Sequence, residues 1–221
     1  MKIQIYGHDS PEDALASSQL GVDFIGVATG ELGHLPNEVS YERCKLIFSA
    51  IPQNSNTSTI ALTISDEISE IIEIVKMVKP DVIHLSGQIH NMPVAKVSQL
   101  KQTIPITKIM QAIPVTDFSS IKLALKYQHV CDYIILDTNI KSDSGDIGAT
   151  GQTHDWNVSR EIVKAVNIPI ILAGGLGPNN VSKAINEVRP WCVDSFTHTN
   201  KPNTYVNDFD KVKSFIEAAR T

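Results

Sequence analysis

Apolar runs and amphipathic segments alternate along the whole chain. Short apolar runs bounded by glycine, proline or polar residues predict buried strands at 2–5, 22–28, 59–64, 81–85, 106–113, 132–136, 168–173 and 192–196. Segments with helical spacing follow these strands, at 10–20, 40–50, 65–78, 93–101, 118–127, 157–166, 178–188 and 208–220. This regular alternation indicates a parallel sheet covered by helices.

Roughly eight strand–helix units, each about 20–30 residues long, favour a closed (β/α)8 TIM barrel with an eight-stranded parallel sheet. An open, doubly wound sheet is the alternative, and it would usually carry a glycine fingerprint after its first strand. The first strand here ends in Tyr6, Gly7 and His8 without that fingerprint, and the glycine turns follow late strands instead. No stretch marks a domain boundary, so we expect residues 1–221 to form one barrel domain.

Composition and charge narrow the class of partner. The net charge is -5 and there is no basic run, which argues against nucleic acid and anionic membranes as partners. No apolar stretch approaches the roughly 20 residues of a membrane span, and the N-terminus passes directly into a strand without a signal-peptide pattern. Cys44, Cys131 and Cys192 have neither zinc nor disulfide spacing. We therefore expect a cytoplasmic protein.

Two glycine-rich turns are candidates for binding a phosphate. Gly174 and Gly175 follow a buried strand and precede a helix N-terminus, where backbone N–H groups and the helix dipole favour an anion. Gly148, Thr150 and Gly151 lie in a long glycine-rich loop, of a length typical of lids and binding loops. A tight strand-to-helix turn and a plain surface loop, neither of which binds a ligand, are the alternatives.

Polar residues at strand ends are candidates for chemistry, because barrel enzymes place their active sites there. Asp137 directly follows an apolar strand, so partial desolvation is expected to raise the pKa of its carboxyl group into the range of a general acid. Tyr6 ends the first strand, and Asp194 lies in the last. His84 and Ser86 share a face of the fourth strand. A helix-cap or loop carboxylate is the alternative for Asp137.

At several of these places the chain resembles the phosphoribosylanthranilate isomerase family. Residues 148–156 (GATGQTHDW) are similar to the family's GGTGKTFDW, and residues 172–181 (LAGGLGPNNV) to its LAGGLTPENV. Three shorter matches accompany them. Gly7 with residues 11–14 is similar to the family's opening KICG and EDA segments, and Leu136 with Asp137 matches its LLDS segment. Residues 188–194 are similar to its VRPYGVDV segment. The resemblance covers nearly the whole chain in the family's order.

The resemblance implies a (β/α)8 barrel of tryptophan biosynthesis that needs neither cofactor nor metal. The family converts N-(5-phosphoribosyl)anthranilate to carboxyphenylamino deoxyribulose phosphate by an Amadori rearrangement. A general acid opens the ribose ring, and a general base then removes the C2 proton. By position, Asp137 matches the general acid, and Gly151, Gly174 and Gly175 match the phosphate cradle. The implied partner is a phosphorylated small molecule, and the protein is expected to be a monomer or a homodimer.

Several positions depart from the family's pattern. Tyr6 stands at the place of the general-base cysteine, and a tyrosine pKa near ~10 makes it a poor base at neutral pH. Asn37 stands at about the place of an arginine that meets the anthranilate carboxylate. Thr197 and His198 fall in the last phosphate segment, and the His198 side chain is expected to crowd that site. Residues 84–87 (HLSG) replace the family's QLHG.

Three hypotheses follow. The first, which we favour, is an isomerase of this family or a close substrate variant, with Asp137 as acid and Tyr6 or another group as base. Its pocket also contains Gly7, Asn37, His84 and Asp194. The second is a barrel repurposed for another sugar phosphate, with an epimerase-like metal held by His8, His84, Asp137, Asp194 and His198. The third is a non-catalytic protein that binds a phosphorylated metabolite.

Overall fold

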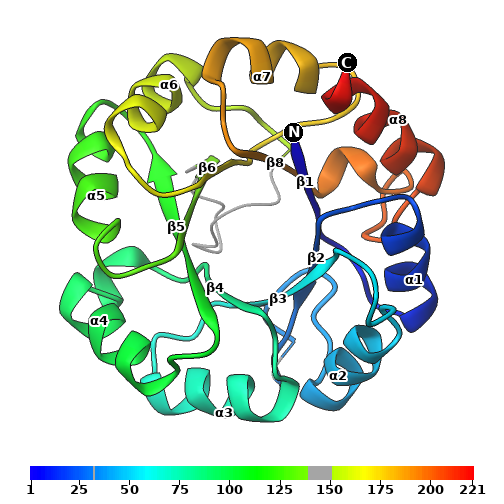
Figure 1. The fold of residues 1–221 in the computed structure, drawn as a ribbon, viewed down its shortest axis with the longest axis horizontal. Helices are drawn as coiled ribbons and strands as arrows, with labels where there is room; N and C mark the ends of the chain where they lie inside the picture. The colour runs from blue at the N-terminus through cyan, green and yellow to red at the C-terminus, as the bar shows by residue number, and fades with distance from the viewer. Residues whose placement is uncertain (32, 139–150) are drawn as a thin grey trace.

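A closed barrel of eight parallel strands, surrounded by helices, forms the architecture (Figure 1). The structure is a computed structural model, and it describes residues 1–31, 33–138 and 151–221. The strands follow one another around the barrel in chain order, and each pairs in parallel with its neighbours. The closed barrel predicted from the alternation is confirmed, and the open sheet is excluded.

The strands lie where the apolar runs predict them, with shifts of one or two residues at their ends. They are β1 Lys2–Ile5, β2 Phe24–Ala28, β3 Ser58–Thr63, β4 Val82–Leu85, β5 Lys108–Val115, β6 Tyr133–Thr138, β7 Ile170–Leu172 and β8 Cys192–Ser195. The barrel closes where β8 pairs with β1, in a register that sets Gln4 opposite Asp194. Strand β6 continues through Thr138, so Asp137 lies within the strand and not just after it.

A helix follows each strand: α1 Pro11–Gln19, α2 Tyr41–Ser49, α3 Ile68–Val78, α4 Val94–Thr103, α5 Ser119–Tyr127, α6 Trp156–Ala165, α7 Val181–Val188 and α8 Phe209–Arg220. The Ser10 hydroxyl accepts from the Asp13 N–H at 3.1 Å and caps the start of α1. Two single 3₁₀ turns, η1 Ile89–Asn91 and η2 Thr197–Thr199, escaped prediction because one turn is too short to create a periodic pattern. Among the described helices, none is both long and apolar enough to cross a membrane.

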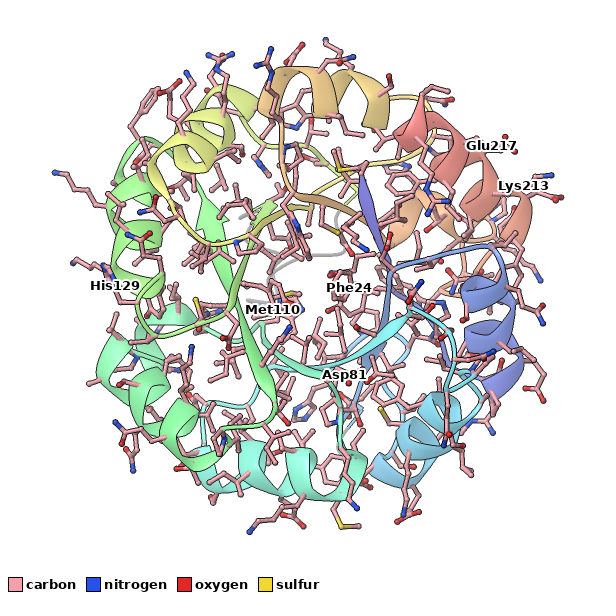
Figure 2. The ribbon with its side chains drawn as sticks, in the orientation of Figure 1. Phe24, Asp81, Met110, His129, Lys213 and Glu217 are labelled. Carbon is pink, nitrogen blue, oxygen red and sulfur yellow. The ribbon has the colours of Figure 1, made fainter. Side chains whose placement is uncertain are left out.

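Two apolar layers stabilise the barrel. The larger one lies between the sheet and the helices, and the smaller one fills the inside of the barrel. Phe24 and Met110 point toward the barrel centre, whereas His129, Lys213 and Glu217 lie on the outer rim (Figure 2). Phe24 and Met110 belong to strands, whereas Lys213 and Glu217 belong to α8 and His129 follows α5, so polar side chains lie on the outer helical layer.

Aromatic side chains close the end of the barrel at which the strands begin. Phe24, Tyr133 and Trp191 contact one another with ring centroids 5.5 to 6.1 Å apart. The ammonium group of Lys108 donates to the Tyr133 hydroxyl at 3.0 Å. These described side chains occupy the end of the barrel opposite to the one at which barrel enzymes place their active sites.

Tyr6 and Gly26 form a matched pair inside the barrel. The Tyr6 side chain is buried, and its ring lies directly over the backbone of Gly26 in the neighbouring strand. A β-carbon at position 26 would overlap the ring carbons of Tyr6. Glycine at this position therefore leaves the space that the phenol ring occupies.

Gly26→Ala is expected to destabilise the protein by roughly 1–3 kcal/mol, because the added methyl group overpacks the barrel against Tyr6. Denaturant unfolding measures the change. In a Tyr6→Cys background the same substitution should be close to neutral, since the ring is gone. An equal loss in both backgrounds would contradict this packing.

Candidate active site

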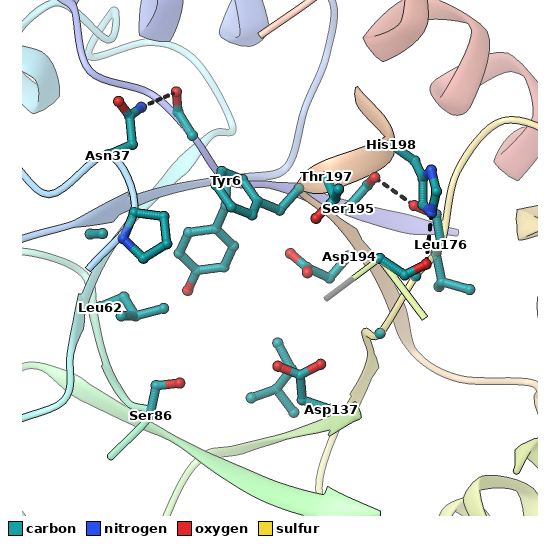
Figure 3. A pocket seen from close by; sticks show the side chains of 18 of the residues that line it. Tyr6, Asn37, Leu62, Ser86, Asp137, Leu176, Asp194, Ser195, Thr197 and His198 are labelled. Carbon is teal, nitrogen blue, oxygen red and sulfur yellow. Dashed lines mark hydrogen bonds between the residues drawn. The ribbon is translucent and has the colours of Figure 1, made fainter. Parts of the chain in front are cut away.

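One cavity opens at the carboxyl ends of the strands (Figure 3), and every residue predicted for the isomerase site that the structure describes lines it. These residues are Tyr6, Gly7, Asn37, His84, Asp137, Gly151, Gly174, Gly175, Asp194, Thr197 and His198. Gly148 and Thr150, also predicted to bind phosphate, lie outside the described residues. The remaining lining is mostly apolar, from Ala28, Leu35, Pro36, Leu62, Ile135, Leu176 and Phe196, with Ser86 and Ser195.

The two glycine turns lie against each other on one side of the cavity. Gly151, Gly174 and Gly175 all have positive φ angles, of 68°, 82° and 62°. A β-carbon on Gly175 would lie 2.6 Å from the carbonyl carbon of Gln152. Such a close approach of two backbones requires glycine, and it brings backbone groups of both turns to one side of the cavity.

A chain of three polar side chains supports these turns from behind. The Thr138 hydroxyl donates to the Gln152 carbonyl at 2.7 Å, and Nδ1 of His154 lies 3.2 Å from the same hydroxyl oxygen. The other ring nitrogen, Nε2, is hydrogen-bonded to the Ser159 hydroxyl at 2.7 Å. Burial lowers the pKa of His154 to about 4, so the ring is neutral at pH 7. Sequence reasoning missed this support, because no local spacing connects Thr138 with His154.

His198 braces the phosphate side of the cavity and does not simply crowd it. Its Nε2 donates to the Gly151 carbonyl oxygen at 3.0 Å (Figure 3). A β-carbon added to Gly177 would lie 2.6 Å from the β-carbon of His198. The absence of a side chain at Gly177 therefore leaves room for His198. The side chain expected to obstruct the site thus links η2 to the Gly151 turn.

Asp137 on β6 and Asp194 on β8, two strands apart in the barrel, face the same cavity (Figure 3). Oδ1 of Asp137 accepts from the Thr138 N–H at 2.7 Å, and Oδ1 of Asp194 accepts from Nε2 of Gln4 at 3.0 Å. Burial raises the pKa of Asp137 to about 6, against that backbone hydrogen bond, which lowers it. Burial also raises the pKa of Asp194 well above its usual value, and the charge of Asp137 raises it further.

Tyr6 and His84 form a buried hydrogen-bonded pair, with 2.6 Å between the phenol oxygen and Nδ1. Burial, followed by the charges of Asp194 and Asp137, raises the pKa of the Tyr6 phenol well above its usual value. Burial lowers the pKa of His84 to about 3. Both groups are therefore neutral at pH 7, and the phenolate that an unassisted tyrosine base requires is disfavoured. The role of Tyr6 as base stays a prediction, with its environment against it.

The position expected to meet an anthranilate carboxylate is used for loop structure. Asn37 has a φ of 59°, and its side-chain amide donates to the Gly7 carbonyl at 2.9 Å. Arg43 lies in α2, where its Nε donates to the Asp9 carbonyl at 2.9 Å. Over residues 1–31, 33–138 and 151–221, no lysine or arginine lines the cavity.

The metal-site hypothesis requires side chains to converge, and the structure separates them. His8 lies outside the cavity lining, with Nε2 hydrogen-bonded to the Ser17 hydroxyl at 2.7 Å and Nδ1 to the Gly26 carbonyl at 3.2 Å. His198 is bonded to Gly151, as described above. Within the described part of the chain, no three His, Cys, Asp or Glu side chains are grouped to hold a metal ion. The described residues therefore give no support to the epimerase-like alternative.

Comparison with known proteins identifies relatives along the full chain. The family model described as N-(5'phosphoribosyl)anthranilate (PRA) isomerase matches residues 3–218. An N-(5'-phosphoribosyl)anthranilate isomerase from Methanocella arvoryzae is 33% identical over 219 residues, which cover 99% of this chain and 98% of the relative.

Solved structures give the same result for the fold. The crystal structure of phosphoribosyl anthranilate isomerase from Thermotoga maritima superimposes with a TM-score of 0.81 at 25% identity, covering 100% of this chain and 98% of the other. A structure of the same name in complex with reduced 1-(o-carboxyphenylamino)-1-deoxyribulose 5-phosphate also gives a TM-score of 0.81, at 23% identity with the same coverage.

Asp137→Asn is expected to stabilise the folded protein at pH 8 by up to about 3 kcal/mol. The folded-state pKa of about 6 lies above the usual value of 3.8, so the folded state binds the proton more tightly than the unfolded state. The wild-type protein therefore loses stability as the pH rises from about 3.8 through about 6, and the uncharged amide of the variant avoids that loss. Denaturant unfolding at pH 8 and pH 4 checks it, and an equal effect at both pH values would contradict it.

Proposed function

This chain belongs to the phosphoribosylanthranilate isomerase family, and we propose that it converts N-(5'-phosphoribosyl)anthranilate to carboxyphenylamino deoxyribulose phosphate by an Amadori rearrangement. One observation carries the proposal: a cradle of glycine turns and the Asp137 carboxyl group share a single cavity. The product analogue bound by a family structure with the same fold carries such a phosphate group. The free thiols of all three cysteines support the predicted cytoplasmic location.

The cradle would hold the substrate by its phosphate. Gly151, Gly174 and Gly175 let backbone N–H groups approach the ester oxygens, as glycine-rich turns do in other phosphate sites. The adjoining side chains of Thr197 and His198 complete this side of the cavity. Holding the phosphate orients the ribose ring toward the barrel axis, where the carboxyl groups lie.

Asp137 supplies the proton for ring opening. Its raised pKa of about 6 keeps part of the carboxyl protonated near neutral pH, while leaving it acidic enough to release the proton. The ring oxygen receives this proton as its bond to C1 breaks, and the nitrogen lone pair forms the C1=N bond. A base must then remove the C2 proton to give the enolamine, which tautomerises to the ketone.

A non-catalytic binding protein is the second candidate function. The described cavity lining lacks a lysine or arginine for the anthranilate carboxylate, and a tyrosine replaces the family's cysteine. Such a protein would bind the phosphorylated product without turning over the substrate. Turnover by purified protein therefore separates the two candidates.

Purified wild-type protein is expected to convert the substrate and to restore growth of a tryptophan auxotroph lacking this isomerase. Asp137→Asn should lower kcat by roughly 10²–10⁴-fold, since the amide cannot donate the proton to the ring oxygen. Asp210→Asn, at an exposed carboxylate in the first turn of α8, is the matched control and should keep full activity. Product binding without any turnover would establish the binding protein instead.

Gly175→Ala is expected to weaken product binding at least tenfold, because the added methyl group would press on the backbone of Gln152 and push the two turns apart. Calorimetric titration of the product measures this loss. Gly33→Ala is the matched control: Gly33 has a similar φ of 68°, but its β-carbon would meet nothing within 4 Å. Equal binding by the two variants would argue against the cradle.

A further inference from the structure

The second step of the proposed reaction needs a base, and the first strand does not supply an obvious one. His84 is buried and hydrogen-bonded to Tyr6, and burial lowers its pKa to about 3, which makes its imidazole a weak base. Tyr6 holds its phenolic proton tightly. Nε2 of His198 donates to the Gly151 carbonyl, so that nitrogen carries a proton and is already hydrogen-bonded. In the described lining of the cavity, Asp194 is the remaining titratable group besides the acid, Asp137.

We infer that Asp194 is the general base of this chain and removes the C2 proton in place of the family's cysteine. The inference rests on the proposed function, because it assigns a further catalytic residue to that reaction.

The placement of Asp194 suits this role. It ends the inward-facing row of β8, beside β1, and it lies between Tyr6 and Asp137 in the cavity (Figure 3). Gln4 holds Oδ1, and within the described residues it is the only hydrogen-bond partner of this carboxylate. Oδ2 is therefore left for the substrate. Asp137 is arranged similarly: Oδ1 accepts from the backbone N–H of Thr138, and no other described residue is hydrogen-bonded to its carboxylate.

The proton affinities of the two carboxyl groups differ, and this difference assigns the role of acid to Asp137 and the role of base to Asp194. Asp137 is the stronger acid of the two and gives up its proton more readily to the ring oxygen. Asp194 holds a proton more tightly, which makes its ionised form the stronger base toward a carbon-bound proton. With one proton on the pair, the reactive form is the minority one in which Asp137 carries the proton and Asp194 is ionised, because Asp194 holds the proton more tightly.

The step balances without any further reactant. Once the ring is open, Oδ2 of Asp194 takes the proton from C2, and the electrons of the C2–H bond form the C1=C2 double bond. The C1=N π electrons return to nitrogen, which gives a neutral enolamine. Moving the C2 hydroxyl proton to C1 gives the ketone, and the carboxyl groups then exchange protons to restore their starting state.

The first experiment compares Asp194→Asn with Tyr6→Phe in the purified full-length chain. Asp194→Asn should lower kcat roughly 10²–10⁴-fold while the KM changes less than about threefold. Substrate deuterated at C2 should show a larger isotope effect with this variant, because proton removal becomes limiting. Tyr6→Phe keeps the ring over Gly26 and should lose at most about tenfold in kcat.

The outcomes are distinct. If Asp194→Asn keeps kcat within tenfold of wild type, or if Tyr6→Phe alone shows the large loss, the inference is overturned while the isomerase function stands. An inactive wild type overturns the proposed function, and the role of Asp194 with it. The exposed carboxylate variant Asp210→Asn is the control for both substitutions.

A second variant tests the inference even if Asp194→Asn does not fold. Gln4→Met removes the hydrogen bond that favours the charged carboxylate, so the pKa of Asp194 should rise. The groups that share the cavity with this carboxylate are Asp137, Tyr6, His84 and His198, and the substitution alters none of them. The pH profile of kcat/KM should be bell-shaped, and its alkaline limb should move up by roughly 0.4–1 pH unit. An unmoved limb overturns the inference.

Discussion

The pairing of β8 with β1 is the interaction on which the candidate site depends. It sets Gln4 opposite Asp194, and their side chains are hydrogen-bonded at 3.0 Å although 190 positions separate them in the chain. The backbone N–H of Tyr6 donates to the Ser195 carbonyl at 3.1 Å, which joins the first and last strands at the rim. Closure therefore brings a phenol from the first strand and a carboxylate from the last one face to face with Asp137 of β6.

The cavity is electrostatically unfavourable for the folded state. It contains two buried carboxyl groups, and no lysine or arginine of the described residues lines it. Apolar layers inside and outside the sheet offset this free energy. An arrangement that is unfavourable for folding but supplies groups of unequal proton affinity is typical of catalytic sites, where strongly shifted pKa values are concentrated.

The residues that depart from the family's pattern form a connected set. The Tyr6 ring occupies the space left by Gly26, and its hydroxyl is bonded to His84, which itself replaces a family residue. Asn37 holds the Gly7 carbonyl in the neighbouring turn. Tyr6, His84 and Asn37 thus each have a hydrogen-bond partner at this end of the barrel.

The sequence by itself determined the barrel, the glycine turns and the place of Asp137 near the end of a buried strand, to within one or two residues. These features depend on local patterns: the period of strands and helices, the backbone freedom of glycine, and the apolar run before a carboxylate. Tertiary structure alone decided that His8 bonds to Ser17 outside the cavity, that His154 supports the glycine turns, and that Tyr6 pairs with His84. These contacts join side chains from different strands and loops, and the register of the closed barrel sets their distances, which no spacing along the chain encodes.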